Sequence, residues 1–167
     1  MNAVKPPLDE AILNELRQVF HAARQGDVDH LAPLLRAGLP ADLTNDAGDS
    51  LLMLAAYHRH APLVALLLAH GADTERRNDK GQSPLGAAAF KGDEAIVALL
   101  LQHGAPVDAT GADGRTALMY AAMFNRAVIV QQLLLAGADP ARRDAMGSTA
   151  AELAVKMGAG ETAALLG

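Results

Sequence analysis

The sequence GDSLLMLAAYHRH, residues 48–60, decides the architecture because the chain repeats its pattern. GQSPLGAAAFKGD follows at residues 81–93 and GRTALMYAAMFNR at residues 114–126, so each copy begins 33 residues after the previous one. The same frame continues to GSTAAELAVKMGA from Gly147 and extends backwards to FHAARQGDVDHLAPLLRAG from Phe20. A fixed period of this length indicates stacked units, each too small to bury an apolar face alone.

Each unit predicts two short helices joined by a tight turn. The first helix follows a hydroxyl side chain that can cap its free amide groups; these residues are Ser50, Ser83, Thr116 and Thr149. The second helix carries leucine triplets and ends at a glycine suited to a left-handed conformation; these glycines are Gly71, Gly104 and Gly137. Pairs of alanines in the first helix allow neighbouring helices to approach within about 8–10 Å. The pattern therefore predicts an all-α solenoid.

The composition agrees with short, closely packed helices and argues against several classes of protein. Of the 167 residues, 51% are hydrophobic, mostly Ala and Leu, and 3% are aromatic. This length predicts a single domain. A net charge of -5 argues against a protein that binds nucleic acid by neutralising phosphates. The absence of cysteine excludes thiolate catalysis and disulfides, and it fits a reducing compartment.

Residues 1–10 do not show the pattern of a secretory signal peptide. Residues 1–10 lack the basic and apolar regions of a signal peptide, and no uncharged apolar stretch long enough to span a membrane follows. We therefore expect a cytoplasmic protein with no membrane partner. An Ala-rich composition with Arg in excess over Lys points to a GC-rich bacterial source.

The repeating unit resembles that of ankyrin-repeat proteins. Their pattern is G-x-T-P-L-x-x-A-A, a short turn, a Leu-rich second helix and G-A-D, and GAD recurs here at residues 71–73 and 137–139. The resemblance implies an α-solenoid of helix pairs with finger loops projecting at one side. It divides the chain into five units, of which the outer two are divergent: 15–44, 45–77, 78–110, 111–143 and 144–167. Residues 1–14 would form an N-terminal extension, partly disordered or adding a helical turn.

The sequence departs from the family pattern at three kinds of position. The family usually has His after T-P-L, where this chain has Met53, Gly86, Met119 and Glu152. Arg59 and Asn125 replace the usual glycine between the helices; Asn tolerates a positive φ, whereas Arg would be strained by about 1–2 kcal/mol. Pro33 lies inside the second helix of the first unit, so we expect that helix to be kinked or to start late.

Residues capable of metal binding or catalysis do not form a recognised motif. His58 and His60 are two positions apart and face different ways, while zinc needs three or four ligands, so we expect no metal and no cofactor. Asp46, Asp79, Asp113 and Asp144 recur near turns, where Asp bonds to its own backbone. No phosphate-binding or nucleophile-elbow motif is present, so we expect no enzyme.

The alternative is a hydrolase or transferase that uses His58 with Asp49 or Lys91. This alternative predicts a pocket with converging polar groups and a strongly shifted pKa for His58.

The resemblance places partner contacts on the finger tips and on the exposed face of the first helices. Tyr57, Phe90 and Phe124 follow the alanine pairs at equivalent or adjacent positions. Aromatic and methionine side chains at a surface are typical binding hot spots. The candidate groove residues are Tyr57, His58, Phe90, Lys91, Met123, Phe124, Met53 and Met119, and the candidate tip residues are Asp49, Lys80 and Arg115. The alternative is that this stripe is the edge of the core. We assign Phe20 and Tyr120 to the core itself.

These observations predict a non-catalytic module that binds a protein partner through the concave face and the finger tips. If it occludes the active site of a partner enzyme, the chain would be an inhibitor or an immunity protein; a scaffold or chaperone would use the same surface. We expect a monomer, and the alternative is a symmetric dimer formed through the apolar stripe. The scaffold itself does not name the partner.

Overall fold

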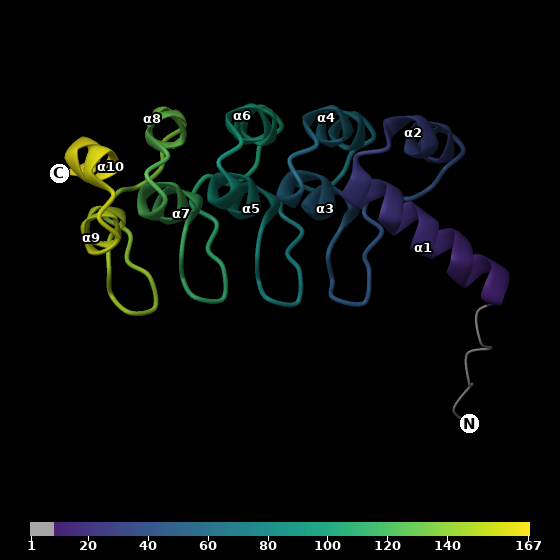
Figure 1. The fold of residues 1–167 in the computed structure, drawn as a ribbon, viewed down its shortest axis with the longest axis horizontal. Helices are drawn as coiled ribbons and strands as arrows, with labels where there is room; N and C mark the ends of the chain where they lie inside the picture. The colour runs from purple at the N-terminus through teal and green to yellow at the C-terminus, as the bar shows by residue number, and fades with distance from the viewer. Residues whose placement is uncertain (1–8) are drawn as a thin grey trace, which may run out of the picture.

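The computed structural model describes residues 9–167, which form ten α-helices and no β-strand. The helices are α1 (Glu10–Gln25), α2 (Val28–Arg36), α3 (Leu51–Tyr57), α4 (Ala61–Ala69), α5 (Pro84–Lys91), α6 (Glu94–Gln102), α7 (Ala117–Met123), α8 (Ala127–Leu135), α9 (Ala150–Lys156) and α10 (Gly160–Leu166). Figure 1 shows α3, α5, α7 and α9 in one row and the even-numbered helices in a second row. Loops project from the first row as fingers (Figure 1). This architecture confirms the predicted solenoid.

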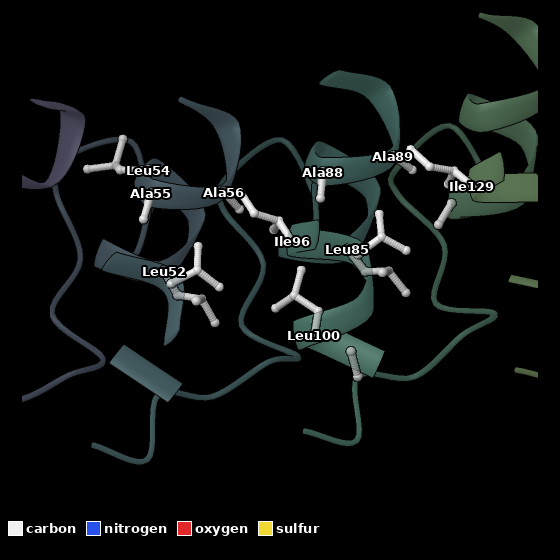
Figure 2. Packing of buried hydrophobic residues seen from close by; sticks show 14 of the residues in the cluster. Leu52, Leu54, Ala55, Ala56, Leu85, Ala88, Ala89, Ile96, Leu100 and Ile129 are labelled. Carbon is white, nitrogen blue, oxygen red and sulfur yellow. The ribbon is translucent and has the colours of Figure 1, made fainter. Parts of the chain in front are cut away.

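Both rows contribute to one continuous core. Neighbouring first helices pack on each other, as do neighbouring second helices. The second alanine of each pair is fully buried; these residues are Ala23, Ala56, Ala89 and Ala122. Figure 2 shows the labelled alanines of α3 and α5 in one line along the stack, with Leu52, Leu85, Ile96 and Leu100 of the same cluster below them. Small side chains therefore line the closest helix contacts, while leucine and isoleucine fill the space between the rows.

The predicted helix starts are present in the structure. Each capping hydroxyl accepts a hydrogen bond from the amide group three residues later, over 3.0 Å at Ser50, 3.1 Å at Ser83 and 3.3 Å at both Thr116 and Thr149. In α9 the Glu152 carboxylate also accepts the Thr149 amide at 2.8 Å, which completes a capping box. The hydroxyl positions thus set the register of the first helices.

The N-terminal region differs from the expectation in part. Of the predicted extension, residues 1–14, the first eight lie outside the described residues. From there, Asp9 caps α1, which is 16 residues long against seven or eight in α3, α5, α7 and α9. In α2, the expected late start is wrong: the helix begins at Val28 because the Asp27 carboxylate accepts the His30 amide at 2.9 Å, before Pro33 is reached.

The turn between the two helices requires glycine in only some units. Gly26 and Gly92 have φ of 71° and 76°. A Cβ on Gly26 would lie 2.5 Å from the His60 ring, and one on Gly92 would lie 2.6 Å from the Arg126 side chain. The backbone conformation therefore disfavours a side chain at these two turns, and a Cβ would also require the side chain of the following unit to move.

Arg59 and Asn125 adopt the same turn with φ of 65° and 55°, as predicted. The Arg59 guanidinium lies 3.4 Å from the Asp93 carboxylate of the next unit. The Asn125 side-chain oxygen accepts the Thr162 amide at 3.1 Å. At these turns the side chain reaches across to the next unit and offsets part of the strain.

Candidate functional site

The exposed sides of α3, α5 and α7, together with the finger loops beside them, form the candidate site, which we call the inner surface. Its three large rings, Tyr57, Phe90 and Phe124, are 39%, 37% and 38% exposed. Tyr57 and Phe90 directly follow the buried alanine pairs at the C-terminal ends of α3 and α5, and Phe124 is the first residue after α7. Each ring therefore stands outside the packed core.

These rings hold one another in defined orientations. Phe90 meets Phe124 edge-to-face with 4.9 Å between ring centroids, and it meets Tyr120 edge-to-face at 6.3 Å. Such T-shaped pairs are the favoured arrangement of aromatic quadrupoles. The Lys91 ammonium lies 4.3 Å from the centroid of the Tyr57 ring, a cation–π contact. The stripe is thus an ordered cluster and not a set of independent side chains.

A cavity of about 170 Å³ opens between α3, α5, α7 and two finger loops. The rings of Tyr57, Phe90 and Tyr120 line it, and Gly86 and Gly111 contribute backbone without a side chain. The Tyr120 hydroxyl donates a hydrogen bond of 3.1 Å to the Asp113 carboxylate. Burial and the negative charge of Asp113 raise the pKa of Tyr120 to about 12, so this phenol stays protonated at neutral pH. We call this space the aromatic cavity.

A second hollow of about 290 Å³ shares Tyr57 with the aromatic cavity and is polar. Arg24, Lys80 and His58 line this basic hollow, together with Asp49. Burial lowers the pKa of His58, and the positive charges of His60, Lys91 and Arg24 lower it further. The charges that act on the pKa of this imidazole are therefore positive.

The sequence of the chain also matches a known family. The sequence model for ankyrin repeats in three copies matches residues 19–111 and 87–167. The chain is an ankyrin-repeat protein. A Pseudomonas aeruginosa protein named as an ankyrin repeat protein is 52% identical over 62 residues, which is 37% of this chain and 36% of that relative. The match therefore spans about a third of the relative's length. Ankyrin repeats are generally modules for protein–protein interaction.

Two methionines expected in the groove lie elsewhere in the ankyrin stack. Met53 and Met119 are only 3% and 1% exposed, so the expectation that they face a partner is wrong. Each lies in the first turn of its helix, where its amide donates a hydrogen bond to the hydroxyl of the buried capping residue. Met123, one unit on from Phe90, is half-buried and packs against the core. The adaptable part of the inner surface is thus smaller than the sequence indicates.

The two residues assigned to the core behave differently. Phe20 is buried, as expected. Tyr120 is half-buried, lines the aromatic cavity and holds its hydroxyl against Asp113, so its assignment to the core alone is wrong. The polar end of a tyrosine needs a hydrogen-bond partner, and the finger loop provides one at the surface.

Two of the three finger residues connect neighbouring ankyrin units. The Asp49 carboxylate accepts hydrogen bonds from the side chains of Asn45 at 3.2 Å and Asn78 at 2.8 Å. The Arg115 guanidinium lies 3.5 Å from both the Asp113 and the Asp144 carboxylates. Lys80 is exposed. Asp49 and Arg115 thus stabilise the fingers, and Lys80 presents its charge to solvent at the tip.

The recurring turn acids share this structural role only in part. Asp144 accepts the Met146 and Ser148 amides at 3.0 and 2.9 Å, and these bonds together with Arg115 lower its pKa despite burial. In two earlier units Asn45 and Asn78 make the equivalent bonds, whereas Asp46 and Asp79 are one residue later and exposed. The sequence interpretation that Asp bonds to its own turn is right for Asp144 and for Asp113, whose carboxylate accepts the Arg115 amide at 3.0 Å. It is wrong for Asp46 and Asp79, because asparagine has this role in their units.

The alternative catalytic arrangement gains no support from these contacts. His58 and Asp49 line the same hollow, yet both Asp49 oxygens accept hydrogen bonds from asparagines, and no hydrogen bond joins Asp49 to His58. Lys91 stacks on Tyr57. No carboxylate among the described residues is hydrogen-bonded to the His58 ring, so none orients it as a general base would require, and the charges that shift its pKa are positive. Ankyrin-repeat proteins are typically non-enzymatic.

Within residues 9–167, no group of three His, Asp or Glu side chains is arranged to hold a metal ion. In the same part of the chain, no helix has the length and apolar character needed to cross a membrane.

Proposed function

We propose that this ankyrin-repeat chain is a non-catalytic module that binds a protein partner through the inner surface, with the finger loops contributing specificity. The observation that carries the proposal is the cluster of Tyr57, Phe90 and Phe124, each more than a third exposed and fixed by edge-to-face or cation–π contacts. Exposed aromatic rings on a rigid scaffold are the side chains that contribute most binding free energy at interfaces.

The order within the cluster supports binding in a second way. A ring already held by its neighbours loses little conformational freedom when a partner covers it. Phe90 contacts both Tyr120 and Phe124, so the centre of the inner surface is fixed before any partner arrives. The buried alanine pairs beneath the rings keep the three helices at constant spacing.

The test is affinity capture from a lysate of the organism that encodes the chain. The bait is the wild type, the Tyr57→Ala/Phe90→Ala/Phe124→Ala variant, or a matched control in which Val128, Leu135 and Met146 become Ala. The control residues are also apolar and exposed, at 47%, 90% and 87%, but they lie on α8 and a finger loop. We expect a protein that is captured by the wild type and the control and lost from the aromatic variant, with helicity unchanged.

A protein retained by the aromatic variant and lost from the control would contradict the proposal and move the site to α8 and its finger loop. If the captured protein is an enzyme, adding the chain to its assay separates an inhibitor or immunity protein from a scaffold. Recovery of the chain itself would instead indicate the symmetric dimer.

A further inference from the structure

The aromatic cavity exists because the repeat pattern breaks at Gly86. Gly86 is the third residue of α5, and the equivalent position carries a large side chain in the other units: Met53, Met119 and Glu152 are third in their helices, and Phe20 lies at the same repeat position within the longer α1. Glycine inside a helix is less stable than a residue with a side chain, so helix formation does not explain it. A Cβ on Gly86 would point toward Tyr120, 3.6 Å from its ring.

A second break faces the same cavity from the finger side. At the first position of the finger turn, Asn45, Asn78 and Asp144 use their side chains to close the turn, whereas the equivalent residue here is Gly111. A Cβ on Gly111 would lie 3.6 Å from the Tyr120 hydroxyl. Two side chains that the pattern supplies elsewhere are therefore both missing next to Tyr120, one beside its ring and one beside its hydroxyl.

The walls of the cavity suit an uncharged, bulky side chain. Three of them are the rings of Tyr57, Phe90 and Tyr120. Arg115, the charged group among the described lining residues, already lies beside the Asp113 and Asp144 carboxylates. An apolar space of about 150 Å³ holds a molecule the size of benzene. A cavity of about 170 Å³ thus accommodates one Leu, Met or Phe side chain.

The basic hollow, which shares Tyr57 with the aromatic cavity, indicates the charge of the ligand residues next to the inserted side chain. Arg24 and Lys80 line the hollow, and Lys91 stacks on the Tyr57 ring. Within residues 9–167, none of these three cations is in an ion pair. Asp49, which accepts hydrogen bonds from two asparagine side chains, contributes one negative charge to the lining, against the three positive charges of Arg24, Lys80 and Lys91. On a chain of net charge -5, this local excess of positive charge favours an acidic ligand.

We propose that the aromatic cavity takes one Leu, Met or Phe side chain from an acidic segment of the partner protein, and that carboxylates of this segment lie in the basic hollow. This inference rests on the proposed function and specifies its ligand. Because Tyr57 borders both spaces, a single short peptide can fill both.

The first experiment selects peptides from a displayed library of random 12-residue sequences on the immobilised full chain. Parallel selections use Gly86→Met, which restores the side chain of the neighbouring units, and Gly160→Met, a matched control at an exposed helical glycine with open space around it. We expect the wild type and Gly160→Met to enrich peptides with an excess of Asp and Glu around one Leu, Met or Phe. Gly86→Met should not enrich them. Enrichment of basic peptides, or none at all, would overturn the inference.

The second experiment measures fluorescence anisotropy of one selected, fluorescein-labelled peptide. Replacing its apolar residue by Ala should weaken binding about tenfold or more, and so should Gly86→Met, which places a side chain beside Tyr120. The Arg24→Gln/Lys80→Gln variant should weaken binding about threefold and flatten its salt dependence. Thermal melting confirms that each variant is folded.

The two proposals fail in different ways. A peptide that is lost in the Tyr57→Ala/Phe90→Ala/Phe124→Ala variant but binds Gly86→Met as tightly as wild type would overturn the cavity inference and leave the inner surface as the binding site. A peptide unaffected by both sets of changes would overturn the cavity inference and count against the inner surface as well.

Discussion

Helices α5 and α7 are nearly interchangeable on their buried sides and different on their exposed sides. Leu85, Ala88 and Ala89 of α5 are as inaccessible as Leu118, Ala121 and Ala122 of α7. On the other side, Gly86 faces a cavity where α7 has buried Met119, and Phe90 is exposed where α7 has half-buried Met123. The repeated side determines how the units stack, and the varied side determines what the stack presents to a partner.

The largest effect should come from breaking the repeated side. Leu118 is 1% exposed, so Leu118→Ala leaves a cavity and should lower the free energy of unfolding by about 3 kcal/mol. Phe90→Ala removes a ring that is 37% exposed and should cost about 1 kcal/mol. Urea denaturation of both variants measures the difference. Equal losses would mean that Phe90 belongs to the core edge and would contradict the distinction between the two sides.

The next effect separates glycines that need only a positive φ from those that also need space. Gly104 has φ of 80°, and a Cβ added there would have no neighbouring atom within 4 Å, so Gly104→Ala should cost about 1 kcal/mol. Gly92→Ala brings its Cβ within 2.6 Å of Arg126 and should cost about 2 kcal/mol. Thermal unfolding of the two variants provides the comparison. In an Arg126→Ala background, the excess cost at Gly92 should disappear.

A smaller effect concerns the finger turn of the last unit. The pKa of the Asp144 carboxyl is lowered, so its contribution to stability is complete above its unfolded pKa, near 3.9, and is lost as the pH falls through the folded value. Asp144→Asn should lower the free energy of unfolding by only about 1 kcal/mol at pH 7, because asparagine can close the turn as Asn45 and Asn78 do. Between pH 5 and 3 the variant should lose stability less steeply than the wild type. Parallel slopes in urea titrations would contradict this role.

The smallest effect has the opposite sign. Gly86→Ala should raise the free energy of unfolding by about 0.5–1 kcal/mol, since alanine favours the helix. Its Cβ would lie 3.2 Å from the Ser83 hydroxyl, a contact that Met53 and Met119 accommodate beside Ser50 and Thr116. Urea denaturation measures the gain. A loss of more than about 1 kcal/mol would show that packing around α5 requires glycine at position 86, and would contradict the view that Gly86 only leaves the aromatic cavity open.

Much of the fold could be predicted from the sequence because the same short-range signals recur in each unit. The capping hydroxyls, the alanine pairs and the positive φ at Arg59 and Asn125 all follow from one unit and its period. The burial of Met53 and Met119 could not be predicted in this way. Whether a side chain in the first turn of a helix is covered depends on the neighbouring units, which the pattern within one unit does not describe.

The candidate site was predictable for the exposed rings and not for the space between them. Tyr57, Phe90 and Phe124 can be located by listing aromatic residues after the alanine pairs. The aromatic cavity depends on side chains that are missing at Gly86 and Gly111, and a search for functional side chains overlooks them. Aligning the units position by position reveals both glycines, but their convergence on Tyr120 requires the fold.

The most direct test of the account is an NMR titration of the ¹⁵N-labelled chain with the captured partner. If the partner binds at the breaks in the repeat, the amide signals of Gly86 and Gly111 should shift or broaden first. The amides of Gly71, Gly104 and Gly137, which end the second helices, should remain in place. Shifts at these three glycines with Gly86 and Gly111 unchanged would show that the partner binds the regular side of the stack, and would contradict the central claim.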